Sequence, residues 1–474
     1  ADLGEDKFVL LKLEDEFVKI MCDINPEFKE DVIYENGKPV LYLQVLKALY
    51  GMIESALLWY SLYTECLLEN GFKLNPVDKC VANKVIDGKQ CSIGWYVDDN
   101  FLSHEDTKVV DGVLELIEGY FPGLQIERGK ILNFLGMEIR FFEDGKASIG
   151  TVQYLKDMIK ALEEELGFEL TKQYANPAGN NLFKIDRTSR KIDEKKADIF
   201  RRYVPMVLWT MKRSRPDMET TVSFLMKRVS EPLRDDWHKF MRMMCFIKQT
   251  IEDVRIIGAD SLLDMLTMVD SAHAVHEENM RGHTGGLITF GTGVVDQKSS
   301  TQKMNARSST DTEQIGTSEY IPKNIYFSMF FEGQGYKLRT NYLCKDNESE
   351  IKLIKNGMDS ATWNSKHIAV KHYWVTDRIK NGDIEIQYCP KQMVADYFSK
   401  PLQGALFHIF RNVIMGWAHI KTVFENYVPP EERVETKAPG PKTKLVQLKK
   451  TYKDAVLTQN SMIQEELKQC RDLF

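Results

Sequence analysis

Apolar and polar positions alternate in short blocks through the first third of the chain. Residues 41–46 have the apolar content of a strand, and residues 53–70 have helical periodicity after a glycine turn. A second helix is predicted over residues 108–120, and residues 130–141 alternate as a strand.

The dipeptide Asp144-Gly145 follows that strand and is a strong hairpin-turn signal. Together these blocks predict an α+β domain that ends near residue 170.

The pattern changes in the rest of the chain. Residues 172–196 are polar and predict a linker, and residues 194–250 have helical periodicity with many basic residues. An apolar block at 262–269 opens a second α/β unit that extends to about residue 402. From residue 428 the chain is rich in Pro, Lys and Glu, which predicts a mostly disordered tail with a short helix near 460–472.

Two adjacent acids, Asp98 and Asp99, lie at a turn between two apolar runs in the segment Tyr96-Val97-Asp98-Asp99. Neighbouring carboxylates repel each other unless a cation lies between them, so one interpretation is a hairpin tip that holds Mg²⁺. The other interpretation is an Asp-Asp turn of the kind that many surface hairpins carry. The tetrad alone does not choose between them.

Composition limits the function classes. The chain has 474 residues, of which 43% are apolar and 11% aromatic, enough for two to four globular domains. The net charge is −6, which is wrong for a protein that binds nucleic acid over its whole surface. Any nucleic-acid contact must therefore come from local basic patches. The basic helical block at 194–250 is either such a patch or an ordinary solvated face.

The eight cysteines are scattered without a Cys-x-x-Cys pair, which favours free thiols in a reducing intracellular compartment. No apolar run reaches membrane-spanning length, so a soluble protein without a membrane partner is expected, cytoplasmic (particle-associated) or nuclear. The first residue is Ala1 rather than Met, which suggests a processed product or a fragment.

A second set of acids occupies the segment 262–402. Its members, in order, close an apolar strand, begin a helix, end another strand and lie in a short helix: Asp270, Glu313, Asp346 and Asp396. Each has an ordinary structural explanation as a turn, a first-turn acid, an N-cap or an exposed helix residue. Taken together, the order resembles ribonuclease H, in which four carboxylates bind two Mg²⁺ ions and activate water against an RNA phosphodiester.

Two other chemistries are weighed for the same region. His273, His276 and His283 lie near Asp270 and raise the idea of a zinc site, but their neighbours are interpreted as polar loop residues and no cysteine is close in sequence. An α/β hydrolase would need a Gly-x-Ser-x-Gly elbow, which the sequence lacks.

Short motifs in a fixed order over more than 350 residues link the two acid sets. They are Lys47-Ala-Leu-Tyr-Gly51 with Trp59-Tyr60, Tyr96-Val-Asp-Asp99, Phe134-Leu-Gly-Met-Glu-Ile139, Leu208-Trp209, Arg215-Pro-Asp217, Trp237, His283-Thr-Gly-Gly286, Lys298-Ser-Ser-Thr-Gln-Lys303, Lys366-His-Ile368, His372-Tyr373, Ala395-Asp396 and Lys400-Pro-Leu402. In this order they resemble the reverse transcriptase–ribonuclease H portion of copia-type LTR-retrotransposon Pol polyproteins, truncated at its N-terminus. The resemblance covers about residues 1–420.

The resemblance implies an α+β fold: a partial reverse-transcriptase palm with thumb and helical connection, then a ribonuclease H-like α/β domain with a mixed five-stranded sheet. The implied divisions are 1–170 for the palm and thumb, 171–260 for the linker and basic helical connection, 261–420 for the ribonuclease H-like domain, and 421–474 for the tail.

The resemblance also implies residue roles. Asp98 and Asp99 match two of the three metal-binding palm aspartates, and Asp270, Glu313, Asp346 and Asp396 match the ribonuclease H acids. The residues that match nucleic-acid contacts are Lys47, Gly51, Tyr96, Phe134, Gly136, Lys366 and His367, with Phe134-Leu135-Gly136 in the primer-gripping hairpin. Lys366 and His367 are equally well explained as a helix N-terminal pair. Lys345 either offsets repulsion among the acids or faces solvent.

The implied cofactor is Mg²⁺, two ions per active site, with Mn²⁺ as an alternative. The implied partners are an RNA template, a DNA primer, an RNA–DNA hybrid and deoxynucleoside triphosphates, and the oligomeric state stays open.

The sequence also departs from the family. Glu54-Ser55-Ala56 replaces the usual Gln-Ala-Pro, and Gln314 occupies an apolar helix position. The third palm aspartate is expected upstream of Ala1, and Asp2, Glu5 and Asp6 are poor substitutes for it. Two functions are therefore consistent with the sequence. One is RNA-directed DNA synthesis, impaired by loss of that aspartate, with Mg²⁺-dependent cleavage of RNA in hybrids. The other is a degenerate remnant that binds nucleic acid or protein without catalysis.

Overall fold

A computed structural model describes residues 8–46, 49, 52, 55–357, 374–389, 392–424 and 427. The expected contact residues Lys47, Gly51, Lys366 and His367 lie outside these residues, as do Asp2, Glu5, Asp6, Glu54 and the predicted tail from 428. All described residues belong to one contact unit, Ala1–Pro430. None of the helices it describes is both long and apolar enough to span a membrane.

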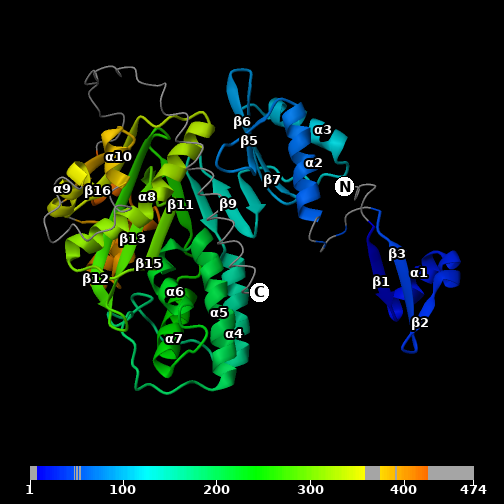
Figure 1. Ribbon diagram of the computed structural model, residues 1–474, viewed down its shortest axis with the longest axis horizontal. Helices are drawn as coiled ribbons and strands as arrows, with labels where there is room; N and C mark the ends of the chain where they lie inside the picture. The colour runs from blue at the N-terminus through cyan, green and yellow to red at the C-terminus, as the bar shows by residue number, and fades with distance from the viewer. Residues whose placement is uncertain are drawn as a thin grey trace. The chain divides into compact units, whose positions relative to one another are not determined.

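The first elements form a small three-stranded sheet with one helix, drawn in blue in Figure 1. The strands are β1 (Leu10–Glu14), β2 (Ile33–Glu35) and β3 (Lys38–Gln44), in the order β1-β3-β2. Helix α1 (Glu16–Ile24) buries Val18 and Cys22 against Leu41 of β3. The predicted strand at 41–46 is thus confirmed, although it begins and ends earlier.

A second sheet carries the Asp98-Asp99 turn. Its strands are β4 (Lys73–Leu74), β5 (Val81–Ile86), β6 (Lys89–Tyr96) and β7 (Asp99–Ser103), paired in that order. Two helices cover it, α2 (Ser55–Glu69) and α3 (Thr107–Tyr120), and both are predicted by the sequence pattern. Their apolar faces meet the inward side chains of β6 in a core that contains Tyr63, Ile93, Trp95 and Ile117.

The predicted strand at 130–141 is wrong as a single strand. Leu135 and Gly136 both have positive φ, 49° and 73°, so the chain turns sharply between β8 (Ile131–Phe134) and β9 (Met137–Phe141). The Asp144-Gly145 turn then leads to β10 (Ala147–Gly150), as predicted. Two distant strands, β11 (Arg255–Ala259) and β14 (Gly291–Thr292), complete a sheet of order β14-β11-β10-β9-β8.

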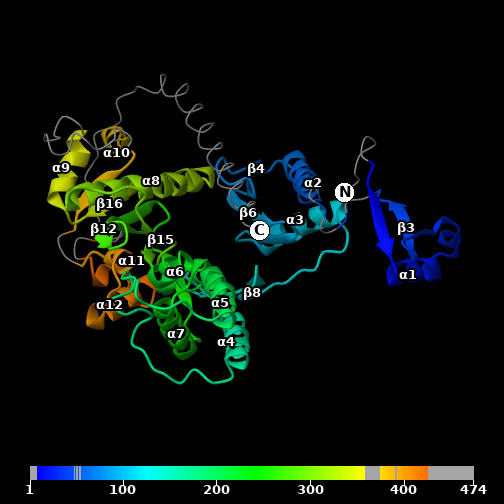
Figure 2. The same ribbon diagram turned by 60° about the horizontal axis from the view of Figure 1, so that its bottom comes forward.

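The helical block predicted at 194–250 is confirmed. It consists of α5 (Glu194–Arg213), α6 (Glu219–Met226) and α7 (Arg234–Gln249). Helices α5 and α7 pack against α4 (Val152–Leu166), and α6 packs against α5 and α7 (Figures 1 and 2). Each presents an apolar stripe to a shared core, with Leu162, Val207, Leu225 and Phe240 fully buried.

Most of the basic residues in this block are engaged by acids. Arg201 pairs with Glu194 and Asp198, Arg228 lies 3.2 Å from Asp236, and Arg215 is buried against Asp217. A free basic face is therefore smaller than the composition of the block suggests.

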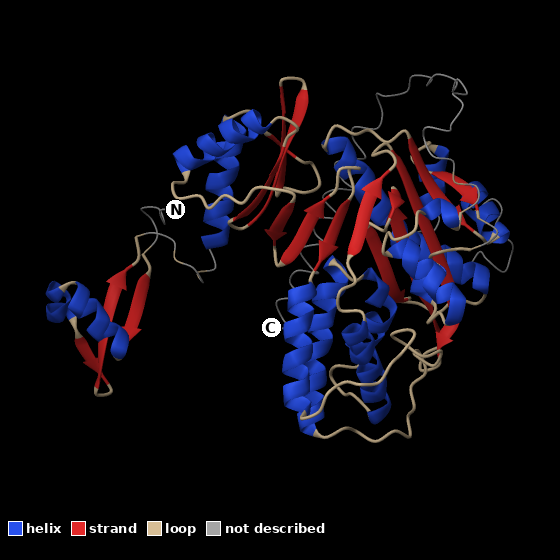
Figure 3. Ribbon diagram, turned by 180° about the vertical axis from the view of Figure 1, so that it is seen from behind, coloured by secondary structure: helices blue, strands red, loops and turns tan. Residues whose placement is uncertain are grey.

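The mixed five-stranded sheet predicted for the second α/β unit is present. Its strands, in the order β15-β13-β12-β16-β17, are β15 (Asp296–Thr301), β13 (Arg281–Thr289), β12 (Asp264–His276), β16 (Thr340–Lys345) and β17 (Glu385–Tyr388). The β12–β16 and β16–β17 pairs are parallel, and the other two are antiparallel. Figure 3 shows helices packed against this sheet.

Glycines let two helices reach opposite faces of the sheet. A Cβ at Gly286 would meet the Tyr320 ring of α8 (Ser309–Gly333) at 2.6 Å. A Cβ at the adjacent Gly285 would meet backbone atoms of the α11 region (helix Asp396–Ser399) at 2.5 Å. Since neighbouring strand residues face opposite sides, α8 and α11 lie on opposite faces.

The remaining described helices are α9 (Glu348–Asn356), α10 (Trp374–Lys380) and α12 (Gly404–Ile414). Short 3₁₀ turns occupy Pro26–Asp31, Pro216–Met218 and Ile420–Thr422. The predicted domain limits at 170, 260 and 420 stay predictions.

Candidate functional site

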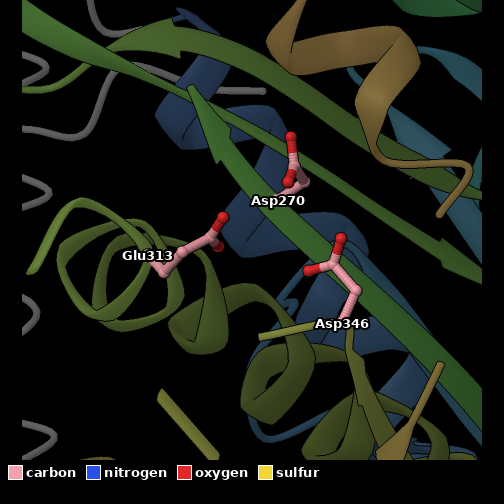
Figure 4. Close-up of side chains that lie close together, drawn as sticks. All are labelled: Asp270, Glu313 and Asp346. Carbon is pink, nitrogen blue, oxygen red and sulfur yellow. The ribbon is translucent and has the colours of Figure 1, made fainter. Parts of the chain in front are cut away.

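Three of the predicted acids converge where β12, α8 and β16 meet. Asp270, Glu313 and Asp346 each place one carboxylate oxygen within 4.8 Å of the others. Figure 4 shows the three side chains close together. A search of the described residues for three or more possible metal ligands this close together finds this group. Residues separated by more than 70 positions in the sequence are therefore brought to one point by the sheet and the helix that covers it.

Strand pairing explains how Asp270 is placed. Asp270 lies in the middle of β12, not at its end, because the strand continues to His276. Its register partner on β13 is Gly285, the residue that allows close approach of the α11 region. The Asp270 side chain is 3% exposed.

Glu313 reaches Asp270 because α8 lies directly against β12. A Cβ at Gly316, one turn after Glu313, would collide with the Ser271 hydroxyl. Glu313 also accepts a hydrogen bond from the backbone N–H of Ser271 at 3.3 Å. Asp346 follows β16, the parallel neighbour of β12, and Asn347 rather than Asp346 caps helix α9.

Lys345 is buried, so the expectation that it offsets repulsion among the acids is favoured over exposure to solvent. Its ammonium donates to Glu313 Oε2 at 2.8 Å and to the Val269 carbonyl at 2.7 Å. It also lies 2.9 Å from Glu350 Oε2, another buried carboxylate. The ammonium thus holds Glu313 from the side of the core.

Asp396 joins the cluster through a second lysine. It is the first residue of α11 and is partly buried, not on an exposed helix face. Lys400 Nζ lies 2.6 Å from Asp396 Oδ1 and 3.3 Å from Asp270 Oδ2. The Ser399 hydroxyl also donates to Asp270 Oδ2.

The four acids differ in the direction in which their surroundings shift their pKa values. Burial raises the pKa of Glu313 well above its usual range, in spite of Lys345. Burial and the charge of Asp270 raise the pKa values of Asp346 and Asp396. Burial acts in the same direction on Asp270, but the Lys400 ammonium and its hydrogen bonds outweigh it and lower the pKa of Asp270.

The donor set fits a hard divalent cation. All of its ligand atoms are carboxylate oxygens, which Mg²⁺ and Mn²⁺ prefer. The three histidines considered for zinc are strand residues, not loop residues. His273 lies in β12 with its Nδ1 2.7 Å from the Thr312 hydroxyl, and Nε2 of His276 lies 2.9 Å from Nδ1 of His283. Nε2 of His276 also contacts the Thr301 hydroxyl, Nε2 of His283 contacts the Ser299 hydroxyl, and burial lowers the pKa of both of these histidines.

The Asp98-Asp99 pair lies at the predicted hairpin turn. Tyr96 pairs with Asp99, so Val97 and Asp98 form a two-residue turn, and both acids are exposed. Val97 has a φ of 57°, an unusual conformation for a β-branched residue, and its carbonyl accepts a hydrogen bond from the Trp59 indole. The described residues do not add a third acid to this pair at the spacing seen around Asp270.

The other predicted nucleic-acid contacts occupy two turns. Tyr96 is 63% exposed beside the acids. Phe134 lies at the β8–β9 turn and packs on Phe101 of β7, with 5.7 Å between ring centroids. A Cβ at Gly136 would lie 3.1 Å from the Trp209 ring of α5, so the turn is seated on that helix.

Three participants were missed from sequence: Glu350, Ser399 and Lys400. Lys400 belongs to the Lys400-Pro-Leu402 motif, which was a weak signal. Glu350 and Ser399 gave none, because polar residues in or beside short helices usually face water.

Comparison with known proteins gives a match in the first part of the chain. The family model described as reverse transcriptase (RNA-dependent DNA polymerase) matches residues 27–176. This stretch of the chain is therefore similar to the reverse transcriptase family.

Two curated relatives extend the similarity. The Retrovirus-related Pol polyprotein from transposon TNT 1-94 of Nicotiana tabacum is 22% identical over 386 residues, 80% of this chain and 28% of the relative. The Transposon Ty1-NL2 Gag-Pol polyprotein of Saccharomyces cerevisiae is 20% identical over 390 residues, 80% of this chain and 22% of the relative. A comparison with solved structures found no match.

The chain is a distant homologue of Copia/Ty1-type retrotransposon Pol polyproteins in their reverse transcriptase region. The resemblance inferred from the motifs is thereby confirmed. The chain spans about a quarter of the length of these relatives, 28% and 22%.

Proposed function

We propose that this chain acts in retrotransposon replication as a reverse transcriptase with a ribonuclease H-type endonuclease, and that the acids around Asp270 cleave RNA in RNA–DNA hybrids. The convergence of Asp270, Glu313 and Asp346 within 4.8 Å carries this proposal. The mixed sheet and the helix α8 that place these acids support it, as does the distant homology to Pol polyproteins.

Each residue has a distinct part in the proposed centre. Asp270, Glu313 and Asp346 would hold the cation, with Asp396 beside them. A bound divalent cation supplies Lewis-acid activation of water and neutralises charge at the phosphate. Two ions per site is the family-based expectation. Lys345 fixes the orientation of Glu313, because its ammonium is held by a carbonyl and two carboxylates in the core.

Hybrid cleavage by the purified 474-residue chain tests the nuclease. A labelled RNA–DNA hybrid with Mg²⁺ should be cut, and Asp346→Asn should abolish cutting without changing the circular dichroism spectrum. Asp377→Asn is a matched control, since Asp377 is an exposed acid on α10. Unchanged cleavage by Asp346→Asn would remove the nuclease assignment.

The remnant that binds without catalysis is the second candidate. One observation favours it: ammonium groups already engage three of the four acids, Glu313, Asp396 and Asp270. Retention of the hybrid by the chain in Mg²⁺, with no cleavage by the unaltered protein, would support the remnant and reject the enzyme.

For DNA synthesis, Asp98 and Asp99 are proposed as two palm metal ligands, with an RNA template, a DNA primer and deoxynucleoside triphosphates as substrates. Because the described residues bring no third acid close to them, primer extension by this 474-residue chain should be weak or absent. Robust extension would show that these two acids, with residues outside the described part, already make a complete site.

A further inference from the structure

Lys400 stands out among the described groups around the acid cluster because its cation lies between two of the proposed ligands. Its Nζ is 2.6 Å from Asp396 Oδ1 and 3.3 Å from Asp270 Oδ2. An ammonium at these distances forms charge-assisted hydrogen bonds with both carboxylates. It therefore lies where an ion shared by Asp270 and Asp396 would have to bind.

The two lysines of the cluster differ in their freedom to move. The Lys345 side chain is completely buried and bonds two carboxylates and a carbonyl, so it cannot leave without exposing charges in the core. The Lys400 side chain is 44% exposed and follows the end of α11. A flexible four-carbon side chain with access to water can swing its ammonium away.

We propose that Lys400 occupies the second cation position of the centre, so that one divalent ion binds readily at Asp270, Glu313 and Asp346 and a second binds only by displacing the Lys400 ammonium. This inference rests on the metal centre of the proposed function. It makes Lys400 a positioning residue that renders the two ion sites unequal.

Charge and geometry both support this inequality. The ammonium supplies one of the two positive charges that a divalent ion would bring to Asp270 and Asp396. A divalent ion added beside it would be repelled at short range, while the first site is reached from Glu313 and Asp346 on other elements. Ser399 adds a hydrogen bond to the same Asp270 oxygen that Lys400 contacts, which fixes that carboxylate for the ammonium.

Mn²⁺ binding in the absence of nucleic acid tests the proposal. Isothermal titration calorimetry and electron paramagnetic resonance would count the ions bound by the full chain, with Asp270→Asn measured in parallel to subtract ions bound elsewhere. The unaltered chain should bind one ion at the centre. Lys400→Gln should bind a second, with its Kd lowered about tenfold or more, because a like charge has been removed from the site.

Two further variants control for charge and for fold. Lys400→Arg keeps the positive charge and should still bind one ion. Lys355→Gln removes an exposed lysine from α9 and should leave the ion count unchanged. Two ions of equal affinity in the unaltered chain, or an unchanged count in a folded Lys400→Gln variant, would overturn the proposal.

The readout separates this proposal from the nuclease assignment. A gain of one ion in Lys400→Gln without hybrid cleavage by any variant would support the role of Lys400 and reject the nuclease. Absence of any Asp270-dependent ion would overturn both.

Discussion

Replacement of Lys345 tests how the acid cluster is held together. Lys345 is fully buried, and its ammonium is shared by Glu313 and Glu350, which are 6% and 0% exposed. Lys345→Gln removes the cation and leaves both carboxylates in the core. We expect this single change to destabilise the mixed sheet strongly.

The expected loss of stability in Lys345→Gln follows from the distance between the Lys345 ammonium and the Glu313 carboxylate. At 2.8 Å and an effective dielectric constant of about 20, the Lys345–Glu313 attraction is about 6 kcal/mol before desolvation is subtracted. Burial of the ammonium cancels much of this, and breaking a buried ion pair costs about 3–5 kcal/mol in practice. The free energy of opening should therefore fall by about 3–5 kcal/mol in Lys345→Gln.

Hydrogen exchange measured by mass spectrometry suits a chain of 474 residues, because it reports opening of individual segments. Peptides from β12, α8 and β16 should lose protection in Lys345→Gln. Adding Glu350→Gln removes one uncompensated charge and should restore part of the protection. Lys355→Gln, on the exposed side of α9, should change little.

The loss of stability in Lys345→Gln should also depend on pH. Burial raises the pKa of Glu313, so the unfolded state releases this proton at a lower pH than the folded state does. Such a group loses stability as pH rises through its folded pKa. Without Lys345 that pKa rises further, so the defect should be larger at pH 8 than at pH 5. A loss below about 1 kcal/mol, or no rescue by Glu350→Gln, would refute the buried ion network.

Two other substitutions probe the same chain. Gln314 is 1% exposed, and within the part of the chain that the structure describes neither of its side-chain amide atoms has a hydrogen-bond partner. Gln314→Leu should therefore raise the free energy of unfolding by about 1–3 kcal/mol in chemical denaturation, and a loss of stability would show that the amide is satisfied. Asp217 is buried, which opposes ionisation, but Arg215 and Arg411 lower its pKa to about 2, so its stabilisation should be lost as pH falls from about 4 to 2. Asp217→Asn should cost about 3–5 kcal/mol at pH 7 and less at pH 2, and an equal cost at both would contradict this role.

Periodicity and turn residues predicted much of the local structure. The helices at 55–69 and 107–120, the Asp98 turn and the helical block after 194 all follow from patterns within one segment. The turn at Leu135 is an exception: this residue gives no turn signal of its own, yet it adopts positive φ beside Gly136, which packs on Trp209.

The candidate site was predicted less completely. The identities of Asp270, Glu313, Asp346 and Asp396 came from their order and from the family resemblance. The contacts of these acids could not be predicted in this way. A lysine just before Asp346 could face either solvent or the core, so the sequence does not show that Lys345 pairs with Glu313. Glu350 and Lys400 entered the site only once α8, α9 and α11 were seen packed on the sheet.

The sequence by itself determined most of the helices and strands, where the acids occur, and the resemblance to retrotransposon Pol polyproteins in their reverse transcriptase region. These properties depend on residues close together in the chain or on the order of motifs. Only the tertiary structure decided that three acids share one point, that Lys345 is buried among them, and that Lys400 lies between Asp270 and Asp396. The physical reason is that burial and charge pairing depend on strand register and helix packing between distant segments, which glycines such as Gly285 and Gly316 permit.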